Sequence, residues 1–183
     1  MQTTQQLTQK FNSRFYTVRP DQHAYTQGGW RGCGYDSSIG VTEIAKVIKT
    51  VVKEKYPKVK LSVISSKYSG GQSLDINLME APFDVFNQPD ASKLSGRDLT
   101  WGVEDAMKRW GYAIDKGNHG VNHYYIDNDY YITDDAKDLF NLIHEVCKYF
   151  NRDDSDSMTD YFDTNFYYSF GIGKWNKAFI KNN

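Results

Sequence analysis

The sequence has little of several features that mark particular classes of protein. Its two cysteines, Cys33 and Cys147, are too few for a disulfide framework. No apolar run approaches the length of a membrane span. The polar first ten residues, MQTTQQLTQK, lack the apolar stretch of a secretory signal. We therefore expect a cytoplasmic protein with two reduced thiols and no contact with a membrane.

The composition is typical of a soluble globular chain. Hydrophobic residues make up 39% of the 183 residues and aromatic residues 15%, which is too much for a solvated coil. A chain of this length can bury a core without a metal or a disulfide. We expect a single α+β domain over residues 1–183, with residues 1–40 as a candidate N-terminal extension of less regular structure.

Hydrophobic periodicity predicts the main elements. A 3.6-residue period predicts helices over residues 41–56, 98–110 and 134–150, with Pro57 ending the first and Gly111 capping the second. Alternation of period two predicts strands over 59–65 and 72–79, joined by a glycine-containing hairpin, and a further strand over 165–172. Residues 28–34, GGWRGCG, indicate a loop. These elements predict a small antiparallel sheet, formed by a β-hairpin and a C-terminal strand, packed against about three helices.

The near-neutral net charge of −1 conceals an uneven distribution. Residues 1–70 hold 11 Lys and Arg against 4 Asp and Glu, a net charge of +7, whereas residues 71–183 have a net charge of −8. Lysines on the polar face of the first helix could neutralise phosphates, with nearby aromatic rings for stacking. The candidate residues for binding nucleic acid or a partner are Trp30, Arg31, Lys46, Lys49, Lys53, Lys67 and Tyr68. The alternative is an ordinary solvated helix face.

An acidic segment follows the third predicted helix. It lacks the glycine and the distal glutamate of a calcium loop. One hypothesis is an acidic surface that imitates phosphates and binds a partner protein, and the other is a solvated loop. The candidate residues of this surface are Asp153, Asp154, Asp156 and Asp160.

The histidines offer the only candidate chemistry. His119 and His123 are four residues apart, but the glycines and asparagines around them disfavour the helix that a zinc-binding pair needs. His144 and Cys147 are three apart, with Cys147 on the apolar face. We expect no metal and no cofactor, and we assign no catalytic residue. An enzyme that uses the His- and Tyr-rich segment 117–131 remains an alternative.

The segment YPKVKLSVISSKYSGGQS, residues 56–73, resembles the helix–hairpin unit of a large polyvalent protein associated domain. The shared features are an aromatic-Pro helix end, a Ser-Val strand, a Tyr-Ser-Gly-Gly hairpin and an alternating second strand. The resemblance is firm over residues 41–79 and loose over 98–175. Glu80-Ala81-Pro82 stands where the family often has a Gly-Pro step.

The resemblance implies a phage or mobile-element origin and a helper or interaction role, such as countering host defence, with no catalytic residues to carry over. Together with the charge distribution, it predicts a non-catalytic binding protein. Its partner would be nucleic acid or a host nucleic-acid-processing complex, for example a CRISPR effector nuclease that it inhibits. The other alternative is a structural accessory module.

Overall fold

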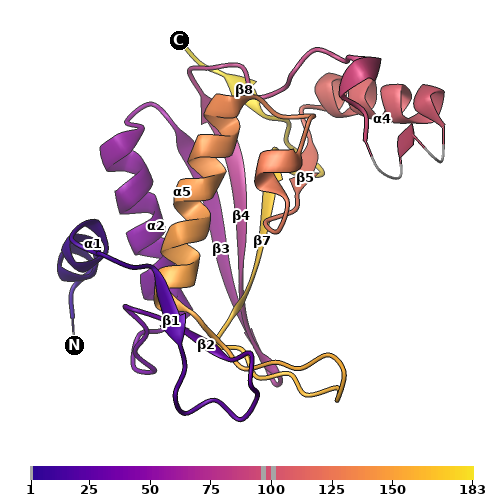
Figure 1. Cartoon of the computed structure of the whole chain (residues 1–183). Helices are drawn as coiled ribbons and strands as arrows, with labels where there is room; N and C mark the ends of the chain where they lie inside the picture. Colours follow the sequence, from indigo (N-terminus) through magenta and orange to yellow (C-terminus); the bar gives the residue numbers. More distant parts are fainter. Residues whose placement is uncertain (1, 96–97, 100–101) are drawn as a thin grey trace. The chain divides into compact units, whose positions relative to one another are not determined.

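The computed structural model describes residues 2–95, 98–99 and 102–183 (Figure 1). The chain divides into two compact units. Unit 1 comprises Met1–Pro57, Val63–Asp75 and Leu142–Tyr168, and unit 2 comprises Lys58–Ser62, Ile76–Asn141 and Ser169–Asn183. Each unit is therefore assembled from segments that are far apart in the sequence.

Two helices of unit 1 lie beside each other, α1 (Thr4–Asn12) and α2 (Val41–Lys55) (Figure 1). A capping box between Thr3 and Gln6 begins α1, because each side chain accepts a hydrogen bond from the backbone N–H of the other residue. The prediction of a helix over 41–56 is confirmed. One face of α2 is buried, as its 3.6-residue period requires, and consists of Val41, Ile44, Ala45, Val47, Ile48, Val51 and Val52.

A three-stranded sheet in unit 1 was not predicted. Strand β2 (Trp30–Gly32) lies between β1 (Val18–Pro20) and β6 (Arg152–Asp153), and both pairings are antiparallel. The prediction of a loop over 28–34 is therefore wrong at 30–32. A Cβ on Gly32 would lie 2.2 Å from the carbonyl oxygens of Lys148 and Tyr149. This glycine marks a close approach of two backbones rather than a loop.

The larger sheet has five strands, in the order β3-β4-β7-β5, with β8 paired to β4. Their bounds are β3 Lys60–Tyr68, β4 Gly71–Ala81, β5 His119–Val121, β7 Tyr167–Ile172 and β8 Ile180–Lys181. The predicted strands over 59–65, 72–79 and 165–172 correspond to β3, β4 and β7. The expected sheet was too small, because two short strands were missed. It was also expected to be antiparallel throughout, but β4 and β8 pair in parallel.

Strand β4 is buried on both sides in its second half. Residues 76–79 are all buried, including Asn77, which the alternation had placed on the exposed face. The strand order gives β4 a neighbour on either side, so it is internal to the sheet. The burial of Asn77 shows that the alternation of period two predicted the strand but not that both of its faces are buried.

Helix α4 (Val103–Lys116) lies in unit 2 and continues past the residue where we expected it to end. Gly111 is inside the helix, and the true cap is Gly117, whose φ of 54° places it in the left-handed region. Trp110 is completely buried, and its Nε1 donates a hydrogen bond of 3.0 Å to the backbone oxygen of Asn87. Ala113 is also buried, so the apolar face extends beyond Gly111. Of the predicted helix over 98–110, residues 100 and 101 lie outside the described residues.

The prediction of a helix over 134–150 is confirmed by α5 (Asp134–Phe150). The described residues also include two single-turn 3-10 helices, Ala91–Lys93 and Ile126–Asn128. The fold is therefore mixed α+β, with sheets larger than we expected. Among the described residues, none of the helices combines the length and the apolar character that crossing a membrane requires.

Candidate functional site

The lysines of α2 occupy its solvent face. Lys46, Lys49 and Lys53 are all exposed, opposite the buried face of the helix. Lys46 forms an ion pair of 3.0 Å with Glu43, and Lys53 donates a hydrogen bond of 2.5 Å to the backbone oxygen of Pro57. In the described part of the chain, Lys49 and Lys53 form no ion pair. These three residues present positive charge that is only partly neutralised.

The end of β3 lies close to the beginning of the same helix. The Oγ1 of Thr42 and the Oγ of Ser65 are 3.3 Å apart. The Nζ of Lys67 lies 3.9 Å from the position that a Cβ on Gly40 would occupy. Thr42 is four residues before Lys46 and therefore belongs to the same stripe of the helix. The structure thus places Lys67 at the N-terminal end of α2, from which Lys46, Lys49 and Lys53 follow along the helix, and these four residues are called the lysine surface below.

Tyr68 follows Lys67 in β3, so its side chain projects from the opposite face of the strand, and it is 51% exposed. A role for this ring in stacking on a partner stays a prediction. The sequence correctly grouped Tyr68 with Lys67 in one hairpin.

Trp30 and Arg31 lie on β2, in a different sheet from Tyr68. The Nη2 of Arg31 donates to Asp21 at 3.1 Å, and its Nε donates to the same oxygen at 3.3 Å. The Nζ of Lys148 lies 5.8 Å from the centroid of the Trp30 ring. Asp21 therefore partly neutralises the charge of Arg31 within the protein. The role of Arg31 in binding a partner stays a prediction.

Asp21 is shared by two arginines. Its side chain is 2% exposed, and Arg152 donates to it through Nε at 3.2 Å while Arg31 donates from the neighbouring strand. Burial alone would raise the pKa of Asp21. The His23 backbone N–H and the charges of Arg31 and Arg152 outweigh burial and hold that pKa below its ordinary value. Asp21 is therefore ionised and structural.

Asp154 is part of the interior, although we predicted it as part of an acidic surface. It is 1% exposed, and its carboxylate accepts hydrogen bonds from the backbone N–H of Tyr25 at 2.6 Å and of Thr26 at 2.8 Å. Burial would raise the pKa of Asp154, but a hydrogen bond of 2.6 Å from the Thr26 hydroxyl, the two backbone hydrogen bonds and the charge of Arg152 together lower it. Its carboxylate fixes the 25–26 turn and is not available to a partner.

The other acidic candidates lie on either side of Asp154, with Asp153 at the end of β6 and Asp156 and Asp160 in the segment that follows. Asp160 is exposed, whereas Asp153 and Asp156 are half-buried. Asp153 accepts a hydrogen bond of 3.0 Å from the backbone N–H of Ser155, and Asp156 accepts one of 2.9 Å from that of Met158. These bonds shape the turn and leave part of each carboxylate open, so the acidic partner-binding surface stays a prediction for these three residues.

The histidines do not assemble a metal site in the part of the chain that the structure describes. His119 lies in β5, so it and His123 do not share a helix face. His144 packs on the ring of Tyr168, and burial raises the pKa of the Cys147 thiol. Among the described residues, no group of three His, Cys, Asp or Glu side chains is placed to hold a metal ion.

His119 lines a hollow of about 600 Å³ in unit 2, which the segment 117–131 forms together with α4. Its Nε2 is 2.8 Å from a carboxylate oxygen of Asp129, and its ring lies 4.7 Å from that of Tyr131. The other lining residues are Lys108, Arg109, Tyr112, Ala113, Asn118, Gly120 and Tyr131. Asp129 was not singled out from the sequence, because only the turn at 126–130 brings it back to His119. An enzyme that uses this segment stays an alternative.

The lysine surface and the residues that line this hollow lie in a segment that matches a known protein family. The family model described as large polyvalent protein associated domain 29 matches residues 39–137, more than half of the chain. The chain belongs to this family. The family assignment predicted from the hairpin motif is confirmed, and the protein is associated with phages and mobile elements. No curated protein and no solved structure matches the chain.

The family region divides the candidate residues. All four residues of the lysine surface, Tyr68 and His119 fall inside residues 39–137. Trp30, Arg31 and the acidic candidates fall outside it. The region that matches the family model therefore includes the whole lysine surface.

Proposed function

We propose that this protein is a non-catalytic binding protein of a phage or mobile element, and that it holds nucleic acid through the lysine surface. The observation that carries the proposal is the arrangement of Lys46, Lys49 and Lys53 on one exposed stripe, with Lys67 added from β3. Three positive charges at a helix spacing, with a fourth from β3 at the N-terminal end of the helix, can follow the phosphates of one strand.

The nucleic acid could be free or part of a host complex that processes it. Inhibition of such a complex, for example a CRISPR effector nuclease, is the more specific form of the proposal. The dipolar charge of the chain supports this form, because exposed acids such as Asp160 could contact the basic groove of a nuclease.

The test is fluorescence anisotropy with a 20-nucleotide single strand and a 20-base-pair duplex, of DNA and of RNA, at 50 and 200 mM salt. Four phosphate contacts predict binding to duplex DNA that is about 100-fold weaker at the higher salt. The triple variant Lys46→Glu, Lys49→Glu, Lys53→Glu should lower the salt dependence by about three ions and abolish binding at 200 mM salt.

A matched control changes the net charge by the same amount in unit 2. The variant Lys93→Glu, Lys116→Glu, Lys177→Glu replaces three exposed lysines outside the lysine surface. Equal losses in the two triple variants would show a general charge effect and contradict the proposed surface. Absence of binding by the wild-type protein at 50 mM salt would contradict direct binding of nucleic acid.

A further inference from the structure

Three arginines lie side by side across the three-stranded sheet of unit 1. Arg19 on β1 is the direct cross-strand partner of Arg31 on β2, and Arg31 is the direct partner of Arg152 on β6. Residues directly opposite each other in an antiparallel pair project from the same face. These three residues therefore form one row, called the arginine row below. Like charges directly opposite each other are destabilising, so an anion between the members of an adjacent pair stabilises the row.

The protein supplies that anion for one of the two adjacent pairs. Asp21 accepts hydrogen bonds from both Arg31 and Arg152, at 3.1 to 3.3 Å. Arg152 is further paired with Asp163 at 2.9 Å. No such carboxylate serves the pair of Arg19 and Arg31, since Arg19 forms no ion pair with any residue that the structure describes. The row is therefore neutralised at one end and positive at the other.

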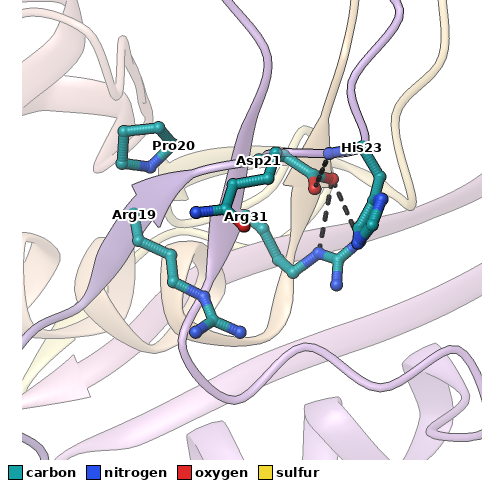
Figure 2. Close-up of a pocket in the computed structure, with 6 residues that line it drawn as sticks. Arg19, Pro20, Asp21, His23 and Arg31 are labelled. Carbon is teal, nitrogen blue, oxygen red and sulfur yellow. Dashed lines mark hydrogen bonds and ion pairs between the residues drawn. The ribbon is translucent and has the colours of Figure 1, made fainter.

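A small pocket lies at the positive end of the row (Figure 2). It measures about 140 Å³, the volume of between four and five molecules of liquid water. Figure 2 shows the bonds that hold Asp21 to Arg31 and to the backbone of His23. The pocket is lined by Arg19, Pro20, Asp21, Gln22, His23 and Arg31.

The donors around this pocket are only partly used. Arg31 has five N–H donors, and the two nitrogens that bond to Asp21 leave Nη1 available. Arg19 is exposed and contributes a second guanidinium from the adjacent strand. Asp21 is held in place by the bond of 3.1 Å from the His23 backbone N–H, and its own N–H donates to Gly29 at 3.0 Å. The orientation of Arg31 is therefore set before any ligand binds.

We propose that this pocket binds a single phosphate monoester, which bridges Arg19 and Arg31 as Asp21 bridges Arg31 and Arg152. A phosphate monoester carries up to two negative charges at pH 7 and accepts paired hydrogen bonds from guanidinium groups. It comes either from a free nucleotide or from the phosphorylated end of a nucleic-acid strand. The second source rests on the proposed function, whereas the first does not depend on the lysine surface.

The experiment compares two oligonucleotides of the same sequence, with a 5′-phosphate and with a 5′-hydroxyl, and adds adenosine 5′-monophosphate and inorganic phosphate as separate probes. NMR titration follows the Arg19 and Arg31 side chains. If the strand end is the ligand, wild-type protein should bind the phosphorylated strand about tenfold more tightly. If a free nucleotide is the ligand, the monophosphate should shift both side chains while the two strands bind equally.

Arg19→Gln should remove the tenfold preference or the nucleotide shift without changing thermal stability, because Arg19 is exposed and forms no ion pair in the described structure. Arg19→Lys should retain only part of the preference or of the nucleotide shift, because an ammonium group cannot donate two parallel hydrogen bonds as a guanidinium does. Lys55→Gln, which removes an exposed charge from the end of α2, is the matched control and should behave as wild type.

The outcomes separate this proposal from the proposed function. The triple glutamate variant of the lysine surface should weaken both strands equally and leave their ratio intact. The proposal is refuted if wild-type protein binds the two strands equally and shows no shift with the monophosphate. It is also refuted if the Arg19→Gln variant keeps the preference or the shift. Shifts with inorganic phosphate alone would indicate nonspecific anion binding and would also overturn the proposal.

Discussion

In unit 1, ion pairs around the buried carboxylate of Asp21 link the strands of the three-stranded sheet, whereas in unit 2 aromatic rings surround a buried tryptophan. In unit 1, Arg31 and Arg152 enclose Asp21, and Arg152 also contacts Asp163. In unit 2, the rings of Tyr130 and Tyr131 each lie 5.2 Å from that of Trp110. Ion pairs depend on protonation, while ring packing does not. The two units should therefore respond differently to substitution and to acid.

The largest effect is expected from Trp110→Ala in unit 2. Trp110 is completely buried and also donates a hydrogen bond to Asn87, so truncation leaves a cavity and an unpaired carbonyl. The free energy of unfolding should fall by about 3–5 kcal/mol. Hydrogen exchange should show faster exchange first in residues 103–132. A loss that begins in α2 and spares α4 would contradict the assignment of Trp110 to an aromatic core of unit 2.

A smaller effect is expected from Asp21→Asn in unit 1. The neutral amide leaves two partly buried guanidinium groups without their shared charge, which should cost about 2–3 kcal/mol of unfolding free energy in urea. The matched control is Asp84→Asn, which breaks an exposed ion pair with Lys181 and should cost less than about 0.5 kcal/mol. Equal costs for the two variants would show that Asp21 is no more important than a surface carboxylate.

The smallest effect is expected on mild acidification to pH 4. The folded-state pKa of Asp21 lies below its ordinary value of 3.8, so its stabilisation is present above that value and is lost as pH falls through the folded-state pKa. The pKa of Asp154 is lowered in the same way. At pH 4 only a minor part of this stabilisation is lost, and the part that Asp21 and Asp154 contribute should be lost from unit 1. Hydrogen exchange at pH 7 and pH 4, corrected for intrinsic rates, should show increased opening of β2 but not of α4.

Much of the fold could be predicted from local patterns. The apolar face of α2, the alternation in β3 and β4 and the Tyr-Ser-Gly-Gly turn were sufficient to predict the helix–hairpin unit and its family. Short strands escaped prediction because β2 and β8 have only three and two residues, too few for a period to be recognised. The glycine-rich segment around Gly32 was interpreted as a loop because glycine gives the same local signal in a loop and at a close backbone contact.

The candidate site residues also divide into those that a local pattern predicted and those whose surroundings only the tertiary structure shows. The lysine surface was predictable because Lys46, Lys49 and Lys53 repeat at helix spacing, and Lys67 lies in the adjoining hairpin. Arg19 gave no signal of its own, since its significance depends on its cross-strand partner. Asp154 was predicted as a surface residue because its neighbours in sequence are acidic and polar.

The sequence by itself determined the α+β class, the helix–hairpin unit and the uneven charge, because these depend on neighbours within a few residues. The tertiary structure decided which charges remain available. Asp21 and Arg152 are 131 residues apart in the chain, and their contact helps to neutralise Arg152, whereas Arg19 in the same sheet stays exposed. Charge neutralisation depends on distances of a few ångströms in space, and no local pattern in the sequence records them.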